Sequence, residues 1–168
     1  MKDLNKLLEK ARHSALYLWI LNNVLWRMIP FNHPHKFKIV GIGENNLKIE
    51  LPYRKVNFNH IKGIHACALA TLCEYVSGLS LLRKLPAEKY RIILKSIHMT
   101  YHFQGKMDVS AEFGVSNDAL MDIAQSLQET DAIFRELPVE VFDKNNNHIC
   151  TGLINWQIKS WDKVKLKV

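Results

Sequence analysis

Cysteine is scarce in this sequence of 168 residues. The three cysteines are an odd number, which argues against a disulfide framework. Cys67 and Cys73 stand six residues apart, which is not a metal-ligand spacing. His33 and His35 flank a proline and have no acidic or cysteine companion nearby, so they suit a surface turn better than a metal. We therefore expect reduced thiols and no metal site.

Long apolar runs are also absent. The stretch from Ala15 to Leu21 is too short to span a bilayer, and Glu74 interrupts the apolar segment 64–82. The N-terminal residues Met-Lys-Asp-Leu-Asn-Lys are charged, and no apolar region with a cleavable small-residue site follows them. We therefore expect no secretory signal, no membrane-spanning helix and a cytoplasmic location.

Basic residues are numerous but dispersed. A formal charge of +7 suits nucleic acid, anionic lipid or a phosphorylated ligand. The sequence has no dense Lys/Arg block, no helix-turn-helix and no aromatic RNA-binding signature, so we expect no nucleic-acid partner. The tail 163–168 alternates like an edge strand, where lysines discourage aggregation.

The apolar periodicity predicts a single α+β domain over residues 1–168. Leucine and alanine recur at three- and four-residue steps from 3 to 27, which predicts an N-terminal helix within 1–30. This helix either packs along the domain or holds a partner or a membrane surface. Strands are predicted at 36–42, 47–51, 90–103, 107–115, 132–142 and 148–159, and a short helix after Ser116-Asn117. Antiparallel hairpins around one apolar helix predict a sheet that wraps the helix.

Residues 62–85 contain that central helix. From Ile64 onward the apolar residues point all round the helix axis, as expected of a helix buried by protein on every side. Glu74 would then lie inside the core, where desolvation raises the pKa of a carboxyl towards the range useful to a general base. Its helical neighbours are small or polar and leave room for a ligand: Ala70, Thr71, Ser77 and Gly78. The alternative is that Glu74 pairs with a lysine or arginine, or reaches the surface.

The start of the central helix is a second candidate site. Backbone N–H groups at Gly63, His65 and Ala66 are expected to be free at the positive end of the helix dipole, where they can hold an oxyanion. Asn59 can orient a water or a carbonyl from there. The alternatives are that Asn59 only caps the loop and that His65 only packs.

His65 and Glu74 are nine residues apart and therefore lie on opposite sides of one helix. They cannot share a site unless a second subunit brings one of them. If both act, the site lies at a dimer interface.

The string Asn59-x-x-x-Gly63-x-His65-Ala66-x-Ala68, followed by Glu74, resembles the hotdog-fold acyl-CoA thioesterases. Within them it is most similar to the phenylacetyl-CoA-thioesterase-like branch and a related group of uncharacterised thioesterase-like domains. The likeness covers the order of elements from about residue 25 to 160.

The resemblance implies a hotdog fold, in which an antiparallel sheet wraps a long central helix, here with an extra N-terminal helix. It implies a homodimer, often a homotetramer, with paired sites at the interface. Glu74 would activate water or attack the thioester, the N–H near Ala66 would stabilise the oxyanion, and His65 would assist carbonyl binding. Asn59 of the other subunit would position substrate or water.

The substrate implied by the resemblance is an acyl-CoA or acyl-carrier thioester. Coenzyme A is part of that substrate, and no separate cofactor or metal is needed. Gly63 and Thr71 would help to bind the substrate, while Lys62 and Lys106 could meet the phosphates of coenzyme A.

The sequence departs from the family pattern at three places, and two of them, Ala66-Cys67 and Leu94, favour a non-hydrolytic acyl-CoA binder as the alternative. Ala66-Cys67 stands where Gly-Gly usually follows the histidine. Lys62 stands where the commoner pattern has glycine, so that Gly63 is displaced by one. Leu94 stands where some relatives carry a serine or threonine that helps the water.

Overall fold

The computed structural model describes residues 2–164, with side chains described from residue 4 onward. Its helices and strands, in chain order, are α1 (Lys2–Arg12), α2 (Ala15–Met28), η1 (Pro30–Asn32), β1 (Lys38–Ile42), β2 (Asn46–Leu51), η2 (Lys55–Asn57), α3 (Ala66–Lys84), β3 (Tyr90–Tyr101), β4 (Val109–Gly114), α4 (Asn117–Glu129), β5 (Ala132–Asp143), β6 (His148–Ser160) and η3 (Trp161–Lys163). The predicted strands are confirmed. The edge strand predicted over 163–168 falls outside the described residues from 165 onward, and Lys163 itself belongs to η3.

The single N-terminal helix predicted over 3–27 is wrong, because the chain forms two helices there. Ser14 takes an extended conformation (φ −147°, ψ 121°), and its side chain accepts a hydrogen bond from the N–H of Tyr17. A serine in this geometry is a favourable N-cap, so it ends one helix and starts the next. Apolar periodicity continues across the break, which is why the sequence pattern did not reveal it.

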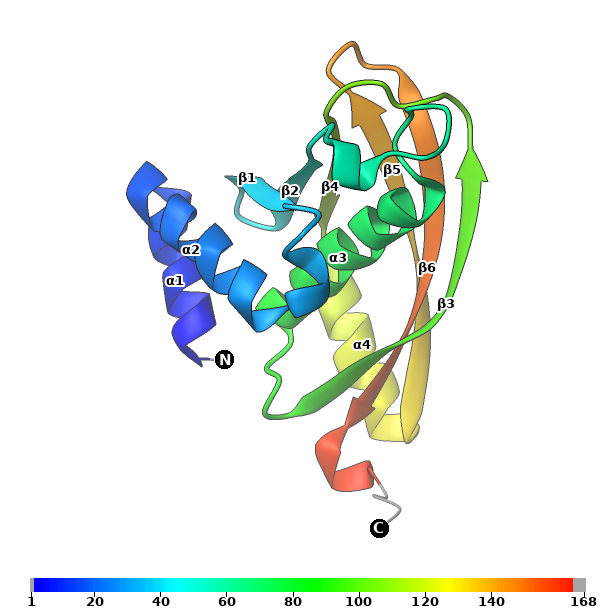
Figure 1. Ribbon diagram of the computed structural model, residues 1–168. Coiled ribbons are helices and arrows are strands. Elements are labelled where there is room, and N and C mark those ends of the chain that lie inside the picture. Colours follow the sequence, from blue (N-terminus) through cyan, green and yellow to red (C-terminus); the bar gives the residue numbers. More distant parts are fainter. Residues whose placement is uncertain (1, 165–168) are drawn as a thin grey trace.

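The six strands form one antiparallel sheet in the order β1-β2-β4-β5-β6-β3. The sheet curves around α3, as Figure 1 shows, and α4 lies beside β5, the strand that follows it in the chain. β5 and β6 pair along nearly their full length, as do β3 and β6, and these three strands form the longest part of the sheet. The predicted wrapping of the central helix is confirmed.

α3 begins at Ala66 and ends at Lys84, so the predicted segment 62–85 is longer than the helix. Leu72, Val76 and Leu81 are fully buried, and α3 contacts strands β2 to β6. Among the residues that the structure describes, α3 is the one helix long and apolar enough to cross a membrane, but most of it is enclosed by the protein. Its composition is therefore explained by its place in the core.

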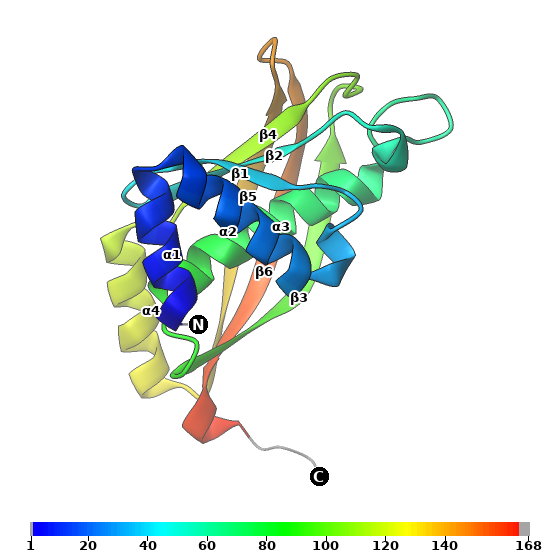
Figure 2. The same ribbon diagram turned by 60° about the vertical axis from the view of Figure 1, so that its left-hand side comes forward.

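The two edges of the sheet differ. α1 and α2 lie against β1, as Figure 2 shows. From α2, Asn22 reaches the middle of β1: its Oδ1 accepts from the N–H of Ile39 at 2.7 Å, and its Nδ2 donates to the Ile39 carbonyl at 3.0 Å. One side chain therefore satisfies both backbone groups that a neighbouring strand would bind. β3 forms the opposite edge, and no described strand pairs with its outer side.

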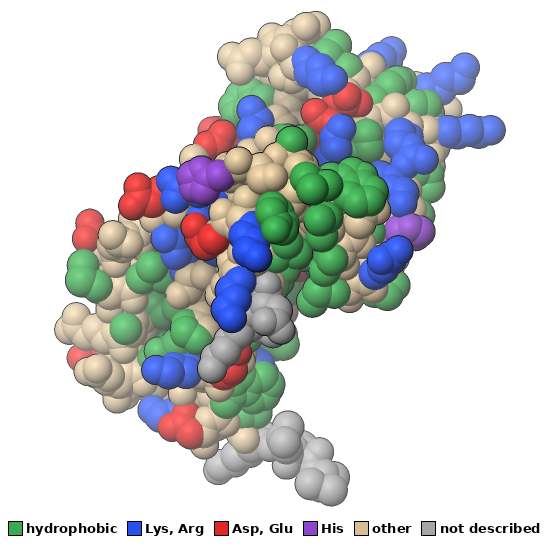
Figure 3. All heavy atoms as spheres, turned by 90° about the vertical axis from the view of Figure 1, so that its left-hand side faces the viewer, with side chains coloured by type: hydrophobic (Ala, Val, Ile, Leu, Met, Phe, Trp, Pro, Cys, Tyr) green, Lys and Arg blue, Asp and Glu red, His purple; other side chains and the backbone are tan. Residues whose placement is uncertain are grey.

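The helix α2 carries exposed hydrophobic side chains. Leu16, Trp19 and Met28 are more than half exposed. In Figure 3 hydrophobic side chains gather on this side of the molecule between basic ones. These exposed side chains provide a surface for binding a partner or a membrane. That role of the N-terminal helices stays a prediction.

Replacement of Asn22 by alanine is expected to lower the free energy of unfolding by about 2–4 kcal/mol, because both backbone groups of Ile39 lose their partner while buried. Urea unfolding measures this. The matched control is Asn23→Ala: Asn23 donates to the carbonyl of Trp19 on the exposed side of the same helix, and its loss should cost less than about 1 kcal/mol. Equal effects at the two positions would show that Asn22 does not shield the strand edge.

Candidate active site

Asn59 holds the loop that precedes α3. Its Oδ1 accepts hydrogen bonds from the N–H groups of Ile61, at 3.1 Å, and Gly63, at 2.9 Å. Its own N–H donates to the carbonyl of Gly63 at 2.8 Å. Asn59 therefore caps the loop, while its amide nitrogen has no partner within residues 2–164 and is free to donate to a ligand.

The first turn of α3 presents one backbone donor. His65 is the N-cap, and its Nδ1 accepts from the N–H of Cys67 at 3.1 Å. The N–H of His65 donates to Asn57 at 2.8 Å, and that of Gly63 to Asn59. The expectation that Gly63 and His65 have free N–H groups is therefore wrong, because both groups bind the loop. The N–H of Ala66 has no partner in the described part of the chain.

Two loops meet at this end of α3. The N–H of Ile64 donates to the carbonyl of Gly105 at 2.9 Å, which brings the segment holding Lys62 next to the one holding Lys106. Gly63 fits closely against Gln104, since a Cβ at Gly63 would lie 2.7 Å from that side chain. Lys62 has φ 58°, a backbone conformation that favours glycine. The commoner family pattern has glycine at this position, which agrees with that conformation.

A cavity of about 310 Å³ adjoins these loops. Asn59, Ala66 and Gln104 line it together with Tyr101, whose hydroxyl donates to the Ala66 carbonyl at 3.1 Å. Ala66, which carries the candidate oxyanion donor, and Asn59, which carries the candidate amide donor, therefore line the same space. Lys62 lies two residues and Lys106 one residue from the contact that joins the two loops, and both are exposed.

Glu74 lines a different cavity, of about 390 Å³. Its carboxylate makes no hydrogen bond or ion pair with the described residues, so the alternative of a lysine or arginine partner does not hold for that part of the chain. Glu74 is only partly buried, however, so it lies at the margin of the core and not inside it, as the alternative of a surface position expected. Burial raises the pKa of Glu74 above its ordinary value. The result is an unpaired carboxylate with increased proton affinity beside an apolar space.

Trp156 of β6 forms one wall of the Glu74 cavity. Its Nε1 donates to the hydroxyl of Ser77 at 3.1 Å, and its ring lies against Gly78. A Cβ at Gly78 would lie 2.8 Å from that ring, so the small residue one turn after Glu74 admits the tryptophan. The space left by the stripe of small residues is thus filled in part by Trp156.

The two remaining candidate residues lie beside the cavities without lining them. Thr71 donates its hydroxyl to the Cys67 carbonyl one turn back, at 2.9 Å. Leu94 is the register partner of Trp156, and it faces the same side of the sheet as Ile92, which lines the Glu74 cavity. Leu94 is 37% exposed, so one side of it stays open to solvent or to a second chain.

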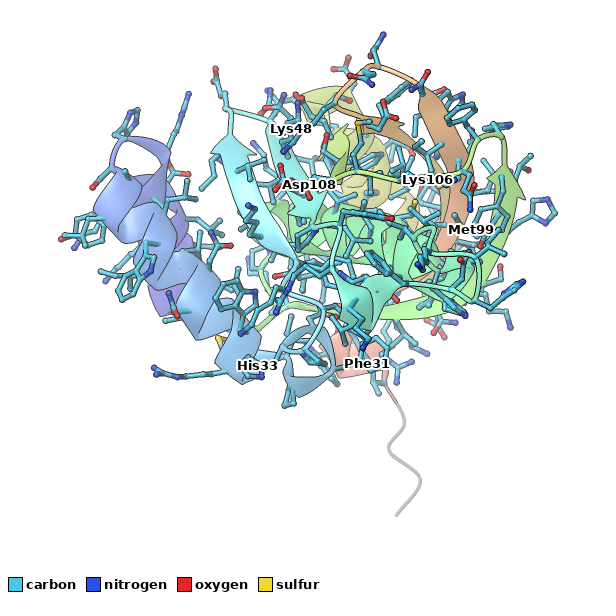
Figure 4. The ribbon with its side chains drawn as sticks, turned by 45° about the horizontal axis from the view of Figure 1, so that its top comes forward. Phe31, His33, Lys48, Met99, Lys106 and Asp108 are labelled. Carbon is cyan, nitrogen blue, oxygen red and sulfur yellow. The ribbon has the colours of Figure 1, made fainter. Side chains whose placement is uncertain are left out.

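Within one chain, Ala66 and Glu74 face separate cavities. Eight residues of helix separate them, which corresponds to about 12 Å along the axis. In Figure 4 Lys106, beside the first cavity, is well separated from Phe31, which lines the second. The expected separation of the helix start from Glu74 is therefore present in the structure.

Several residues of the Glu74 cavity could not be found from sequence reasoning. Phe31 and Asn32 come from η1, a segment that the sequence marks only as the turn after a helix. Ile92 and Trp156 come from strands whose alternation places them inward without indicating a ligand site. Each is far from Glu74 in the chain, and only the folded arrangement brings them together.

A family model described as "Domain of unknown function (DUF4442)" matches residues 18–158. No curated protein matches the chain in sequence. A protein of unknown function from Pseudomonas aeruginosa, described as a probable thioesterase, is similar in structure with a TM-score of 0.76 and 20% identity, over 90% of this chain and 95% of that one. A thioesterase from Haemophilus influenzae has a TM-score of 0.64 and 13% identity, over 85% and 90% of the two chains.

Two structures of one Staphylococcus aureus protein, called a thioesterase enzyme in the first, are also similar. Each has a TM-score of 0.61 and 11% identity; they cover 78% and 77% of this chain, and 99% and 98% of theirs. The first carries a glutamine-to-alanine change and the second a glutamate-to-alanine change, at positions fifteen residues apart. At such identities these likenesses show the fold, and they confirm the predicted hotdog fold.

Replacement of Glu74 by glutamine is expected to make stability less dependent on pH. Because burial raises the pKa of Glu74, the folded protein keeps a proton that the unfolded chain releases once the pH passes about 4.5. The free energy of unfolding of the wild type should therefore fall relative to that of Glu74→Gln as the pH rises above 4.5.

Urea unfolding at a series of pH values measures this difference. Glu88→Gln, at an exposed glutamate, is the control and should follow the wild type throughout. A difference between the wild type and Glu74→Gln that stays constant with pH would contradict the raised pKa.

Proposed function

The chain belongs to the DUF4442 family, and from its fold and cavities we propose that it is a hydrolase of acyl thioesters, with acyl-CoA as the substrate class. The observation that carries the proposal is Glu74: an unpaired carboxylate with a raised pKa beside an apolar cavity. A carboxylate in this setting can accept a proton from water near neutral pH. The surrounding apolar walls suit an acyl chain.

The spacing of the candidate residues supports this assignment. Fifteen residues separate Asn59 from Glu74, and the same interval separates the glutamine and the glutamate changed in the Staphylococcus aureus protein. An asparagine and a glutamine present the same amide group. We infer that Asn59 and Glu74 form a functional pair of an amide and a carboxylate.

We further propose that the active unit is a dimer joined along β3. A long, open edge strand is a template for pairing with another chain. On the opposite edge Asn22 already occupies the backbone groups of β1, whereas Ile93 and Leu94 of β3 are exposed hydrophobic residues. An antiparallel pair of β3 strands would continue the sheet and bring the two copies of α3 together, so that Ala66 and Asn59 of one subunit approach Glu74 of the other.

The proposed reaction assigns each group one role. Glu74 removes a proton from water, the hydroxide adds to the thioester carbonyl carbon, and the carbon–sulfur bond then breaks as the thiolate leaves and takes up a proton. The N–H of Ala66 stabilises the oxyanion. The amide of Asn59 and the Nε2–H of His65 orient the carbonyl and the water. Lys62 and Lys106 meet the phosphates of coenzyme A.

The reaction is tested by thiol release from a panel of short, long and aromatic acyl-CoAs. Glu74→Gln keeps the size of the side chain and removes the base, so turnover should fall by about 10²–10⁴-fold. Glu88→Gln, the exposed control, should keep the wild-type rate. Turnover that is equal in wild type and Glu74→Gln would place the chemistry on another residue, and absent turnover in both would favour the acyl-CoA binder.

The two-subunit site is tested by mixing inactive variants. Asn59→Asp keeps the oxygen that holds the loop and removes the amide N–H, so it should lower turnover without unfolding the loop. Co-expression of Asn59→Asp with Glu74→Gln should restore about a quarter of wild-type turnover, since half of the dimers would be mixed and each mixed dimer would hold one intact site. No restoration would mean that both residues act within one subunit, and a monomer in sizing chromatography would contradict the dimer.

A further inference from the structure

Asn32 places an amide group in the wall of the Glu74 cavity. It belongs to η1, the segment between α2 and β1, and it is 4% exposed. Its backbone is fixed on both sides, because its N–H donates to Ile29 at 3.0 Å and its carbonyl accepts from Lys36 at 3.1 Å. The side-chain amide makes no hydrogen bond with any described residue, and it is not fully enclosed, since Asn32 lines the open cavity.

Tyr75 adds a second polar group to the same cavity. It is 6% exposed, and its ring packs edge-on against Phe37 at a centroid distance of 6.0 Å. Its hydroxyl also lacks a partner within residues 2–164. Burial, and to a smaller extent the charge of Glu74, raises the pKa of Tyr75, so its hydroxyl keeps its proton and can donate.

These two groups stand out because, apart from Glu74, the remaining side chains of the cavity wall are apolar. Ile29, Leu79, Leu82, Ile92 and Trp156 are among them. Trp156 already donates its N–H to Ser77, so it offers no polar atom to a ligand. Buried amide and hydroxyl groups are nearly always hydrogen-bonded in folded proteins, because an unmet buried polar group is unfavourable. In this open cavity, either water or a polar atom of a ligand is the available partner.

We propose that Asn32 and Tyr75 form a polar subsite that selects acyl groups bearing a hydroxyl substituent. A hydroxyl can accept from Tyr75 and from the Asn32 amide nitrogen, and it can donate to the Asn32 amide oxygen. A plain alkyl chain would bury both groups without a partner and would bind more weakly. This inference rests on the proposed function only in placing the acyl chain in the Glu74 cavity.

Binding is measured separately from turnover. In the Glu74→Gln background, where the proposed hydrolysis is blocked, titration calorimetry compares octanoyl-CoA with its 3-hydroxy and 8-hydroxy analogues. At least one hydroxylated ligand should bind about tenfold more tightly than octanoyl-CoA or better. Thiol release by the wild type from the same three compounds reports the proposed hydrolysis independently.

Asn32→Leu and Tyr75→Phe are the matched variants, since each keeps nearly the same volume and removes the polar group. Each should bring the affinity ratio between the hydroxylated and plain ligands towards one. Urea unfolding should show that neither variant is less stable than its parent, because neither group has a partner inside the protein.

Equal affinities for all three ligands in the parent, as expected if only water fills the cavity, would overturn the proposal. An affinity ratio that both variants leave unchanged, or a failure to bind any of the three ligands, would overturn it as well. Loss of stability in both variants without a change in the ratio would assign Asn32 and Tyr75 a structural role instead.

Discussion

The structure depends on the burial of α3 by a single curved sheet. Leu72 and Val76 are fully buried, and Trp156 closes the contact between helix and sheet by lying in the space above Gly78 and donating to Ser77. Interiors are close-packed, so a helix apolar on every side needs cover on every side. The sheet supplies most of that cover, and the N-terminal segment η1 supplies part of the rest.

The same packing explains why Glu74 is exceptional. The ion pairs of the described chain lie at or near the surface, where the charges keep some contact with water, and Glu74 takes part in none of them. Glu74 lies on the half-buried side of α3, beside the cavity that η1 and Trp156 leave open. A cavity holding an unpaired carboxylate and two unpartnered polar groups is unfavourable for folding alone, and such local conflicts are expected at functional sites.

The two edges of the sheet differ because the N-terminal helices lie against one of them, and this difference bears on how two copies of the chain can associate. Asn22 takes the place of a neighbouring strand beside Ile39, so association through β1 would have to displace α2. Within residues 2–164, no strand pairs with the outer side of β3. The N-terminal helices shield β1, so β3 is the edge through which two copies can join. The proposed two-subunit site needs such a dimer, because one chain keeps Ala66 and Glu74 in separate cavities.

The sequence by itself determined the central helix, the strands and the nine-residue separation of His65 from Glu74, because these follow from local periodicity and helix geometry. It also contained the serine that divides the N-terminal helix, but periodicity carried on past Ser14 and hid the break. Only the tertiary structure decided that the N–H groups of Gly63 and His65 are used by the loop while that of Ala66 is free. The tertiary structure alone also brought Asn32 and Trp156 to the cavity beside Glu74. Both are more than forty residues from Glu74 in the chain, and such contacts depend on how the sheet closes around the helix, which no local sequence pattern encodes.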